Sequence, residues 1–441
     1  MATVVDYLSW RGDLSFVERP FNEVDALILA TLSYLDFTGI APSGDNVITL
    51  RDACEALLDQ AAGDLAPYVR SLASIDESFL RALAASRRFG RLAMRDYVDV
   101  VDDARSLQFA ALTVDLGACA PADAFVSFRG TDLTLTGWRE DLMLSFEVTE
   151  AQERARAYLE RILGQGHTVL VGGHSKGGNL AAFAVAAADE RLLDGVVRAW
   201  SFDGPGMDPA VMARGPLDAI GSRFRRVQPA YSVVGQLFDR ADTPRRHVVS
   251  SADAMMQHDP MTWQVDRDAL VLADGLDPAA RRLDDALAAW LSDLDLDQRA
   301  AFTTELFDIL GAGGATSLSD LTTPANLQRV AAAAAGASET TKSVVMGLVG
   351  AGVSSTTGSV AAAIGSAVKG AVHGAQHAAA GAAQAAGSVL RRGEKDAASQ
   401  EAAHPEVDAA GQPTALSTDE TILIEDVTTD HSVEKGQRRA R

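Results

Sequence analysis

A strand–turn–helix–strand unit near the middle of the sequence constrains the fold more than any other feature. The apolar run 168–171 (TVLV) leads into a glycine-rich turn, 177–189 is an alanine-rich segment typical of a helix, and a second apolar run spans 196–202. Strands joined in this way are parallel, with a right-handed crossover. We therefore predict an α/β fold with an open, mostly parallel sheet and helices on both faces. Ligands of such sheets bind at the carboxyl ends of the strands.

Other segments before residue 313 fit the same alternation of helices and strands. Their patterns predict helices over 22–35, 52–57, 138–144 and 151–163, and strands over 109–114 and 124–128.

The turn of the central unit, 173–178 (GHSKGG), matches the pattern G-x-S-x-G. This pattern describes a tight turn that presents a serine hydroxyl above the sheet. Gly173 and Gly177 flank it because side chains there would collide with the neighbouring strand and helix. The match is weak alone in a chain with 37 glycines, but it lies between a strand and a helix, as the motif requires. We predict that Ser175 is a nucleophile; the alternative is a glycine-rich turn that only packs.

A nucleophilic serine needs a histidine as its base, and in folds of this type that histidine follows the serine. Of the eight histidines, four lie in the C-terminal part and two precede the serine, which leaves His247 and His258. His247 opens an apparent strand, where a side chain is more often structural. His258 follows that strand in a loop and should emerge at the same edge as Ser175. We predict His258 as the base, with a surface capping role as the alternative.

The acid that orients the histidine is open among three aspartates. Asp203 ends the strand after the nucleophile helix, and so lies at the carboxyl edge of the sheet; a turn-forming role fits it equally well. Asp239 and Asp259 are the alternatives, although Asp259 is close to His258 in sequence for orienting its ring.

The charge balance excludes some classes of partner. With 39 Lys and Arg against 60 Asp and Glu, the net charge is −21, which disfavours sequence-blind binding to nucleic acid or anionic lipid. Cys54 and Cys119 are far apart and outside any metal-binding spacing, which fits a reducing compartment. The first twenty residues lack the pattern of a secretory signal, so we expect a cytoplasmic protein.

The composition changes near residue 313, after which there is no Trp, Tyr or Phe. We therefore predict a globular domain over 1–312, an Ala- and Gly-rich, weakly helical segment over 313–392, and an acidic disordered tail over 393–441. The uncharged stretch 343–368 is long enough to span a bilayer but poor in large apolar residues. Membrane contact through 343–390 and a flexible stalk are both open.

Two motifs together resemble those of class 3 lipases. The segment 125–132 (FVSFRGTD), followed by Trp138 and the pair at 141–142 (DL), is similar to their V-x-F-R-G-[ST] … W … D-L segment, and GHSKGG is similar to their G-H-S-L-G-G. The resemblance implies an α/β-hydrolase-like fold. It also implies an oxyanion hole formed by the backbone amides of Thr131 and Lys176.

Three further segments, 6–13, 21–25 and 257–263, resemble an uncharacterised bacterial family distantly related to these lipases. That likeness covers roughly residues 1–270 and implies no substrate.

The sequence also departs from the lipase pattern. Where those lipases carry the catalytic aspartate, this chain has 231–235 (YSVVG), so the acid has moved or is missing. Lys176 replaces a leucine, and its cation would favour an anionic substrate or point to solvent. The short, charged segment 131–144 does not fit a wide apolar lid for bulk triglyceride.

These observations predict a serine hydrolase, esterase- or lipase-like, that cleaves a small-molecule or lipid-derived carboxylic ester or thioester through an acyl-enzyme. Such chemistry needs no metal or organic cofactor. The alternative is a catalytically weakened hydrolase-fold scaffold or a membrane-associating binding protein. A third hypothesis is a hydrolase that 343–390 docks to the membrane periphery.

Overall fold

The computed structural model describes residues 2–341 except 43–45, 72, 106, 118–119, 132–134, 145–146, 208–219, 237–243, 282–284, 286–294, 313, 315–328, 331, 334–335 and 339–340; at 103, 136, 138, 142, 254 and 255 it describes the backbone only. The chain divides into two units, Met1–Ala378 and Ala379–Arg441, and every described residue belongs to the first. The boundaries predicted at 312 and 392 stay predictions, and 343–390 lies outside the described residues.

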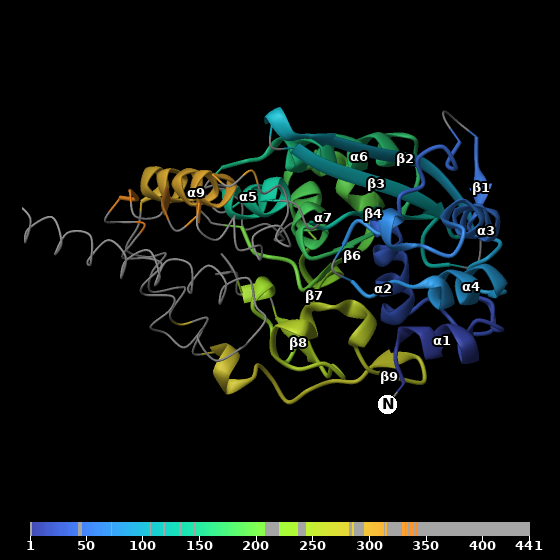
Figure 1. Cartoon of the computed structure of the whole chain (residues 1–441). Helices are drawn as coiled ribbons and strands as arrows, with labels where there is room; N and C mark the ends of the chain where they lie inside the picture. Colours follow the sequence, from blue (N-terminus) through green and yellow to red (C-terminus); the bar gives the residue numbers. More distant parts are fainter. Residues whose placement is uncertain are drawn as a thin grey trace, which may run out of the picture. The chain divides into compact units, whose positions relative to one another are not determined.

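Eight strands form one sheet and are hydrogen-bonded in the order in which they occur in the chain (Figure 1). They are β1 (Ile48–Thr49), β2 (Ala93–Asp102), β3 (Leu107–Asp115), β4 (Ala124–Phe128), β5 (Val169–His174), β6 (Val196–Phe202), β7 (Phe224–Pro229) and β8 (Arg245–Val248). Pairing is antiparallel from β1 to β4 and parallel from β4 to β8. A two-stranded hairpin of β9 (Val265–Asp266) and β10 (Ala269–Leu270) follows.

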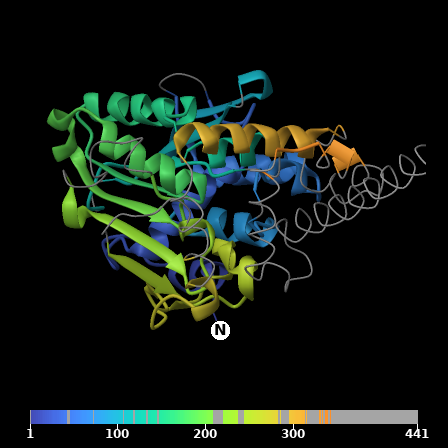
Figure 2. The ribbon, with the colours of Figure 1, turned by 90° about the vertical axis from the view of Figure 1, so that its left-hand side faces the viewer.

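Helices cover both faces of the sheet (Figures 1 and 2). One layer contains α1 (Val4–Arg11), α2 (Glu23–Thr31), α3 (Leu50–Ala61) and α4 (Glu77–Ala85); the other contains α6 (Glu150–Gly164) and α7 (Lys176–Ala187). Two further helices, α5 (Leu135–Met143) and α9 (Leu296–Gly311), pack against each other.

The sheet has two cores because successive side chains in a strand point to opposite faces. In β4, Phe125 packs into the core under the first four helices, whereas its neighbour Val126 packs against α6 and α7. Leu170 and Val171 divide in the same way in β5. The predicted α/β-hydrolase-like architecture, a mostly parallel sheet with helices on both faces, is therefore confirmed.

Two short 3₁₀ turns follow the last strand of the sheet. After β8 the chain forms η7 (Ala254–His258) and η8 (Pro260–Thr262), which bring residues 254–262 back beside the carboxyl ends of the parallel strands. None of the helices in the described part of the chain is long and apolar enough to cross a bilayer.

Candidate active site

Ser175 stands at the turn between β5 and α7 in a strained backbone conformation. Its φ is 57° and its ψ −132°, a region that L-residues rarely occupy. A Cβ added at Gly173 would lie 2.2 Å from the carbonyl oxygen of Gly177, and one added at Gly177 would lie 2.1 Å from that of Phe128. Both glycines are therefore required by close backbone contacts, as the G-x-S-x-G turn demands.

Asp203 and His258 form a hydrogen-bonded pair at the same edge of the sheet. Asp203 directly follows β6, and its Oδ2 lies 2.6 Å from Nδ1 of His258, the last residue of η7. A carboxylate can only accept, so Nδ1 carries the proton and Nε2 is left as the basic nitrogen. Asp203 is fully buried, whereas the His258 side chain is 21% exposed.

Residues 231–235, which stand where the lipase pattern has its aspartate, donate hydrogen bonds to Asp203. Ser232 Oγ and the backbone N–H of Gly235 both donate to Asp203 Oδ1. The carboxylate thus has partners on both oxygens, which fixes its orientation toward His258. Asp203 also has a positive φ of 48°, so the turn role weighed for it and the contact with His258 occur in the same residue.

Ser175 lies beside this pair. Its backbone N–H donates to the carbonyl of Phe202, the residue before Asp203, at 2.9 Å. The ring of His174, the residue before the serine, is 4.6 Å from the ring of His258 between centroids. Ser175 is 8% exposed, and among the described residues its hydroxyl has no hydrogen-bond partner. In ligand-free enzymes the bond from a nucleophile to its base is often formed only with substrate.

Lys176 corrects one expectation. Its side chain neither reaches solvent nor faces a substrate, because it is completely buried. Nζ donates to Glu140 Oε2 at 2.8 Å and to the carbonyl of Gln108 at 3.0 Å. As the first residue of α7, Lys176 has a backbone N–H without an acceptor inside the helix, which leaves that group available to an oxyanion.

Thr131, the other predicted oxyanion residue, is held by α5. Thr131 Oγ1 donates to Asp141 Oδ2 at 2.5 Å. Asp141 Oδ1 is buried without a partner in the described part of the chain. Burial, the largest cause, raises the pKa of Asp141 to about 7, although Lys176, Thr131 and His258 all act to lower it.

Sequence reasoning missed a buried pair, Tyr34 and His174, under the elbow. His174 Nε2 is 2.8 Å from the backbone carbonyl of His258, so Nε2 carries the proton and Nδ1 accepts from Tyr34 Oη, also at 2.8 Å. Burial holds the pKa of His174 well below its usual value and keeps the ring neutral. His174 could have been identified as a site residue, because it belongs to the GHSKGG turn. No sequence pattern indicates Tyr34.

The remaining candidates have other positions. His247 lies within β8, near Gln228. Asp259 accepts from the backbone N–H groups of Met261 and Ser74, so it caps η8 rather than contacting the His258 ring. Asp239 lies outside the described residues.

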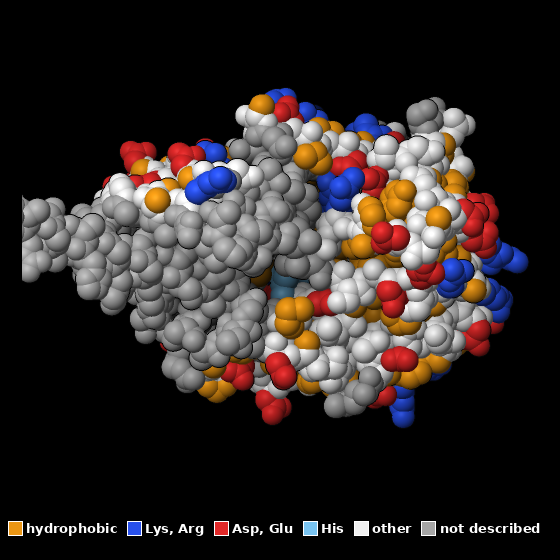
Figure 3. Space-filling view, viewed as in Figure 1, with side chains coloured by type: hydrophobic (Ala, Val, Ile, Leu, Met, Phe, Trp, Pro, Cys, Tyr) orange, Lys and Arg blue, Asp and Glu red, His pale blue; other side chains and the backbone are white. Residues whose placement is uncertain are grey.

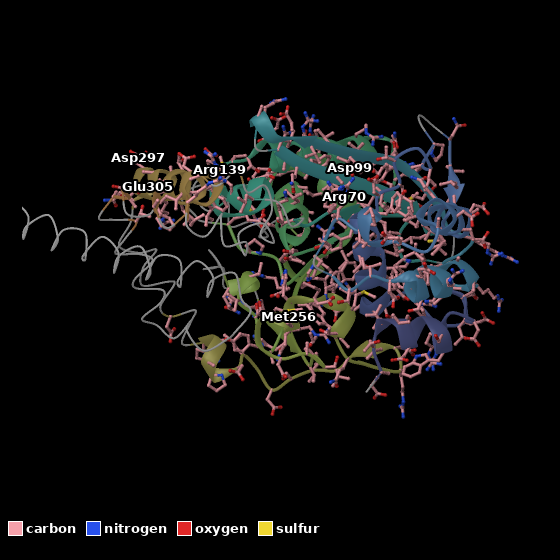
Figure 4. The ribbon with its side chains drawn as sticks, in the orientation of Figure 1. Arg70, Asp99, Arg139, Met256, Asp297 and Glu305 are labelled. Carbon is pink, nitrogen blue, oxygen red and sulfur yellow. The ribbon has the colours of Figure 1, made fainter. Side chains whose placement is uncertain are left out.

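Figure 3 shows a histidine side chain in a recess of one face of the molecule, and Figure 4 labels Met256 on the same face. Met256 is 60% exposed and comes two residues before His258 in η7, so this turn carries an exposed apolar side chain. Within the described ranges, no three His, Cys, Asp or Glu side chains gather in a way that would hold a metal ion.

The mostly parallel sheet with helices on both faces defines an α/β-hydrolase-like fold. Residues 83–308, just over half of the chain, match the family model described as Mbeg1-like. The chain belongs to the Mbeg1-like family.

Two further comparisons add little to this. The crystal structure of M37 lipase is similar to this chain with a TM-score of 0.31 and 15% identity, covering 49% of this chain and 70% of that one. Comparison with curated proteins gave no match.

Proposed function

We propose that this chain is a serine hydrolase that cleaves a carboxylic ester or thioester through an acyl-enzyme. The observation that carries the proposal is the 2.6 Å contact between Asp203 and His258 beside the strained turn of Ser175. An oriented histidine next to a serine is the arrangement that activates the hydroxyl group.

In the proposed reaction, His258 Nε2 takes the proton of Ser175 Oγ while Oγ bonds to the carbonyl carbon of the substrate. The imidazolium is stabilised by Asp203, which is buried and hydrogen-bonded on both carboxylate oxygens. Collapse of the tetrahedral intermediate breaks the bond to the alcohol or thiol, which leaves with the proton from His258. Water then attacks the acyl-enzyme with the same base, and the carboxylic acid and free Ser175 are released.

The negative charge on the carbonyl oxygen needs two converging donors. The backbone amides of Thr131 and Lys176 are the proposed pair. Lys176 begins the helix that follows the nucleophile, and Thr131 follows Gly130 at the end of β4, the strand next to β5. A Cβ added at Gly130 would lie 2.6 Å from the carbonyl oxygen of His174, so the two segments are in close contact.

The substrate class proposed is a small-molecule or lipid-derived ester. Met256, exposed and two residues before His258 in η7, offers an apolar surface for an acyl chain. Helix α5 does not suit the role of a wide apolar lid, because its Glu140 and Asp141 carboxylates accept hydrogen bonds from Lys176 and Thr131. The proposed steps involve no metal or organic cofactor.

The alternative, a catalytically weakened scaffold, rested on a displaced or missing acid. The contact of the Asp203 carboxylate with His258 supports the hydrolase over the scaffold. The membrane role of 343–390 concerns residues outside the described part of the chain.

The test is labelling of the purified full chain with a fluorophosphonate probe, which reacts only with an activated serine. We expect wild type to be labelled, and Ser175→Ala and His258→Ala to lose labelling. His247→Ala is the matched control, because that histidine lies on β8 near Gln228, and it should be labelled like wild type. Folded wild type that takes up no probe would overturn the proposal.

A further inference from the structure

A closed ring of buried polar contacts joins the elbow to α5 and to β3. Lys176 Nζ donates to Glu140 Oε2 at 2.8 Å and to the carbonyl oxygen of Gln108 at 3.0 Å; the backbone N–H of Gln108 donates to the same Glu140 oxygen at 3.2 Å. The side chains of Lys176 and Glu140 are 0% and 2% exposed. Three elements that are separate in sequence are thus fixed to one another at a single point.

The cost of this arrangement calls for a reason. Moving two charges out of water is unfavourable, and an apolar pair of similar volume is often as stable or more stable. A leucine in place of Lys176 would avoid that cost. The ion pair does something that an apolar side chain cannot, because it is directional and holds its partner at one distance and angle.

What the ring fixes is the residue whose amide is proposed to bind the oxyanion. The backbone N–H of Lys176 can stabilise that charge only when it points at one position, about 3 Å from the oxygen. Its own side chain, anchored at Nζ by Glu140, limits the rotation of the first turn of α7. The next residue of α5, Asp141, holds Thr131.

We propose that Glu140 is a positioning residue of this site, which acts through the Lys176 side chain to hold the second oxyanion-hole amide in its productive orientation. The inference rests on the proposed function. It assigns Glu140 and the Lys176 ammonium no contact with the substrate. Helix α5 itself packs against α9, and Figure 4 shows Arg139 of α5 next to the helix that carries Glu305, so the anchor lies on a supported element.

The main test compares Glu140→Gln with Asp25→Asn in the full chain. Asp25 is also a buried carboxylate paired with a cation, Arg88, but lies in the N-terminal layer. Both variants should lower the melting temperature. For each, the rate of fluorophosphonate labelling is measured against probe concentration and pH, at a temperature where the protein is folded.

We expect Glu140→Gln to lower the maximal labelling rate about 10- to 100-fold, less than the loss of a whole oxyanion donor. Its half-saturating probe concentration and the pH of half-maximal labelling should stay as in wild type, because His258 and Asp203 are untouched. Asp25→Asn should be labelled at the wild-type rate. Equal labelling of wild type and Glu140→Gln, or an equal loss in both variants, would overturn the proposal.

A second variant covers the case in which Glu140→Gln does not fold. Replacing both partners, Lys176→Met with Glu140→Leu, removes the two buried charges together, and such a replacement is often neutral or stabilising. This protein should fold and still be labelled slowly; labelling at the wild-type rate would refute the positioning role. If folded wild type itself is not labelled, the proposed function fails and this inference falls with it, whereas labelled wild type with unaffected variants overturns the inference alone.

Discussion

Two buried ion pairs in this molecule each join a carboxylate to a cation but have different surroundings. Arg88 contacts both carboxylate oxygens of Asp25, and its remaining N–H groups donate to backbone carbonyls in the segment between α1 and α2, such as those of Leu14 and Arg19. Lys176 and Glu140 lie at the elbow. The first pair ties a layer of helices together, and the second ties together the parts of a site.

Burial and pairing therefore do not by themselves indicate a function. What matters is which other groups each partner holds. Asp25 also accepts a hydrogen bond from Tyr7, another residue of the N-terminal layer, so loss of Asp25 should lower the stability of the fold. Lys176 is the neighbour of Ser175, so loss of its partner Glu140 should lower the reaction rate.

Asp203→Asn should have the greatest effect on the labelling rate. An amide cannot hold the His258 ring in the required tautomer, and we expect the labelling rate to fall about 10⁴-fold. The change in shape is minimal, so the unfolding transition should move little. Time-resolved fluorophosphonate labelling measures the effect. Asp259→Asn is the control, because Asp259 caps η8 instead, and it should cost stability with little loss of rate.

Next in size is the removal of the cation from the N-terminal pair by Arg88→Met. This leaves the Asp25 carboxylate buried without its counter-charge, and we expect a loss of about 3–5 kcal/mol in the free energy of unfolding. Urea denaturation measures it. Protein that remains folded should be labelled at the wild-type rate; slow labelling at full foldedness would show that the two regions are not independent.

Gly130→Ala tests the contact between the end of β4 and the turn that carries Ser175. The new Cβ would meet Tyr34 Oη at 2.2 Å and the His174 carbonyl oxygen at 2.6 Å. Overpacking of this kind costs about 1–3 kcal/mol, and here it would also push Thr131 away from the elbow. We expect lower stability and slower labelling together. Gly130→Ala with Tyr34→Phe should recover only part of both, since the backbone contact persists.

The smallest effect concerns the pH dependence contributed by Asp141. Its folded pKa, about 7, is above the ordinary value of 3.8, so the stability it contributes is present below about pH 4 and is lost as the pH rises through 7. Asp141→Asn removes this loss. The melting temperature of the variant relative to wild type should therefore rise between pH 5 and pH 8, by a few degrees at most because the residue is partly exposed. A constant difference across that range would contradict the assignment.

Much of the fold follows from local pattern. The apolar runs 124–128 and 196–202 are β4 and β6 with the predicted ends. The predicted helix 22–35 is shorter, because α2 ends at Thr31 and a 3₁₀ turn leads Leu35 into an extended bridge with Val69. Strand β7 is not among the predicted strands, because two arginines interrupt its apolar residues. Arg226 is nevertheless buried, and it donates to the carbonyls of Gly204 and Gly235.

The site divides in the same way. The sequence predicts Ser175 and His258 and leaves Asp203 as one of three candidate acids, because these residues come after predicted strands and the carboxyl ends of parallel strands share an edge. The fate of the Lys176 side chain depends on Glu140, which lies 36 residues earlier on another helix. No local pattern could indicate that partner. Tyr34 escaped for the same reason, because its contact with His174 spans 140 residues.

The order of the strands bears on how the chain folds during synthesis. Because each strand pairs with the one synthesised just before it, the strands can add to the sheet one at a time as the chain leaves the ribosome. Ser175 and Asp203 come together when β6 is laid against β5, but His258 is synthesised after β7 and β8. A nascent chain would therefore contain Ser175 and Asp203 before His258, and the proposed reaction could not take place until the last strands have folded.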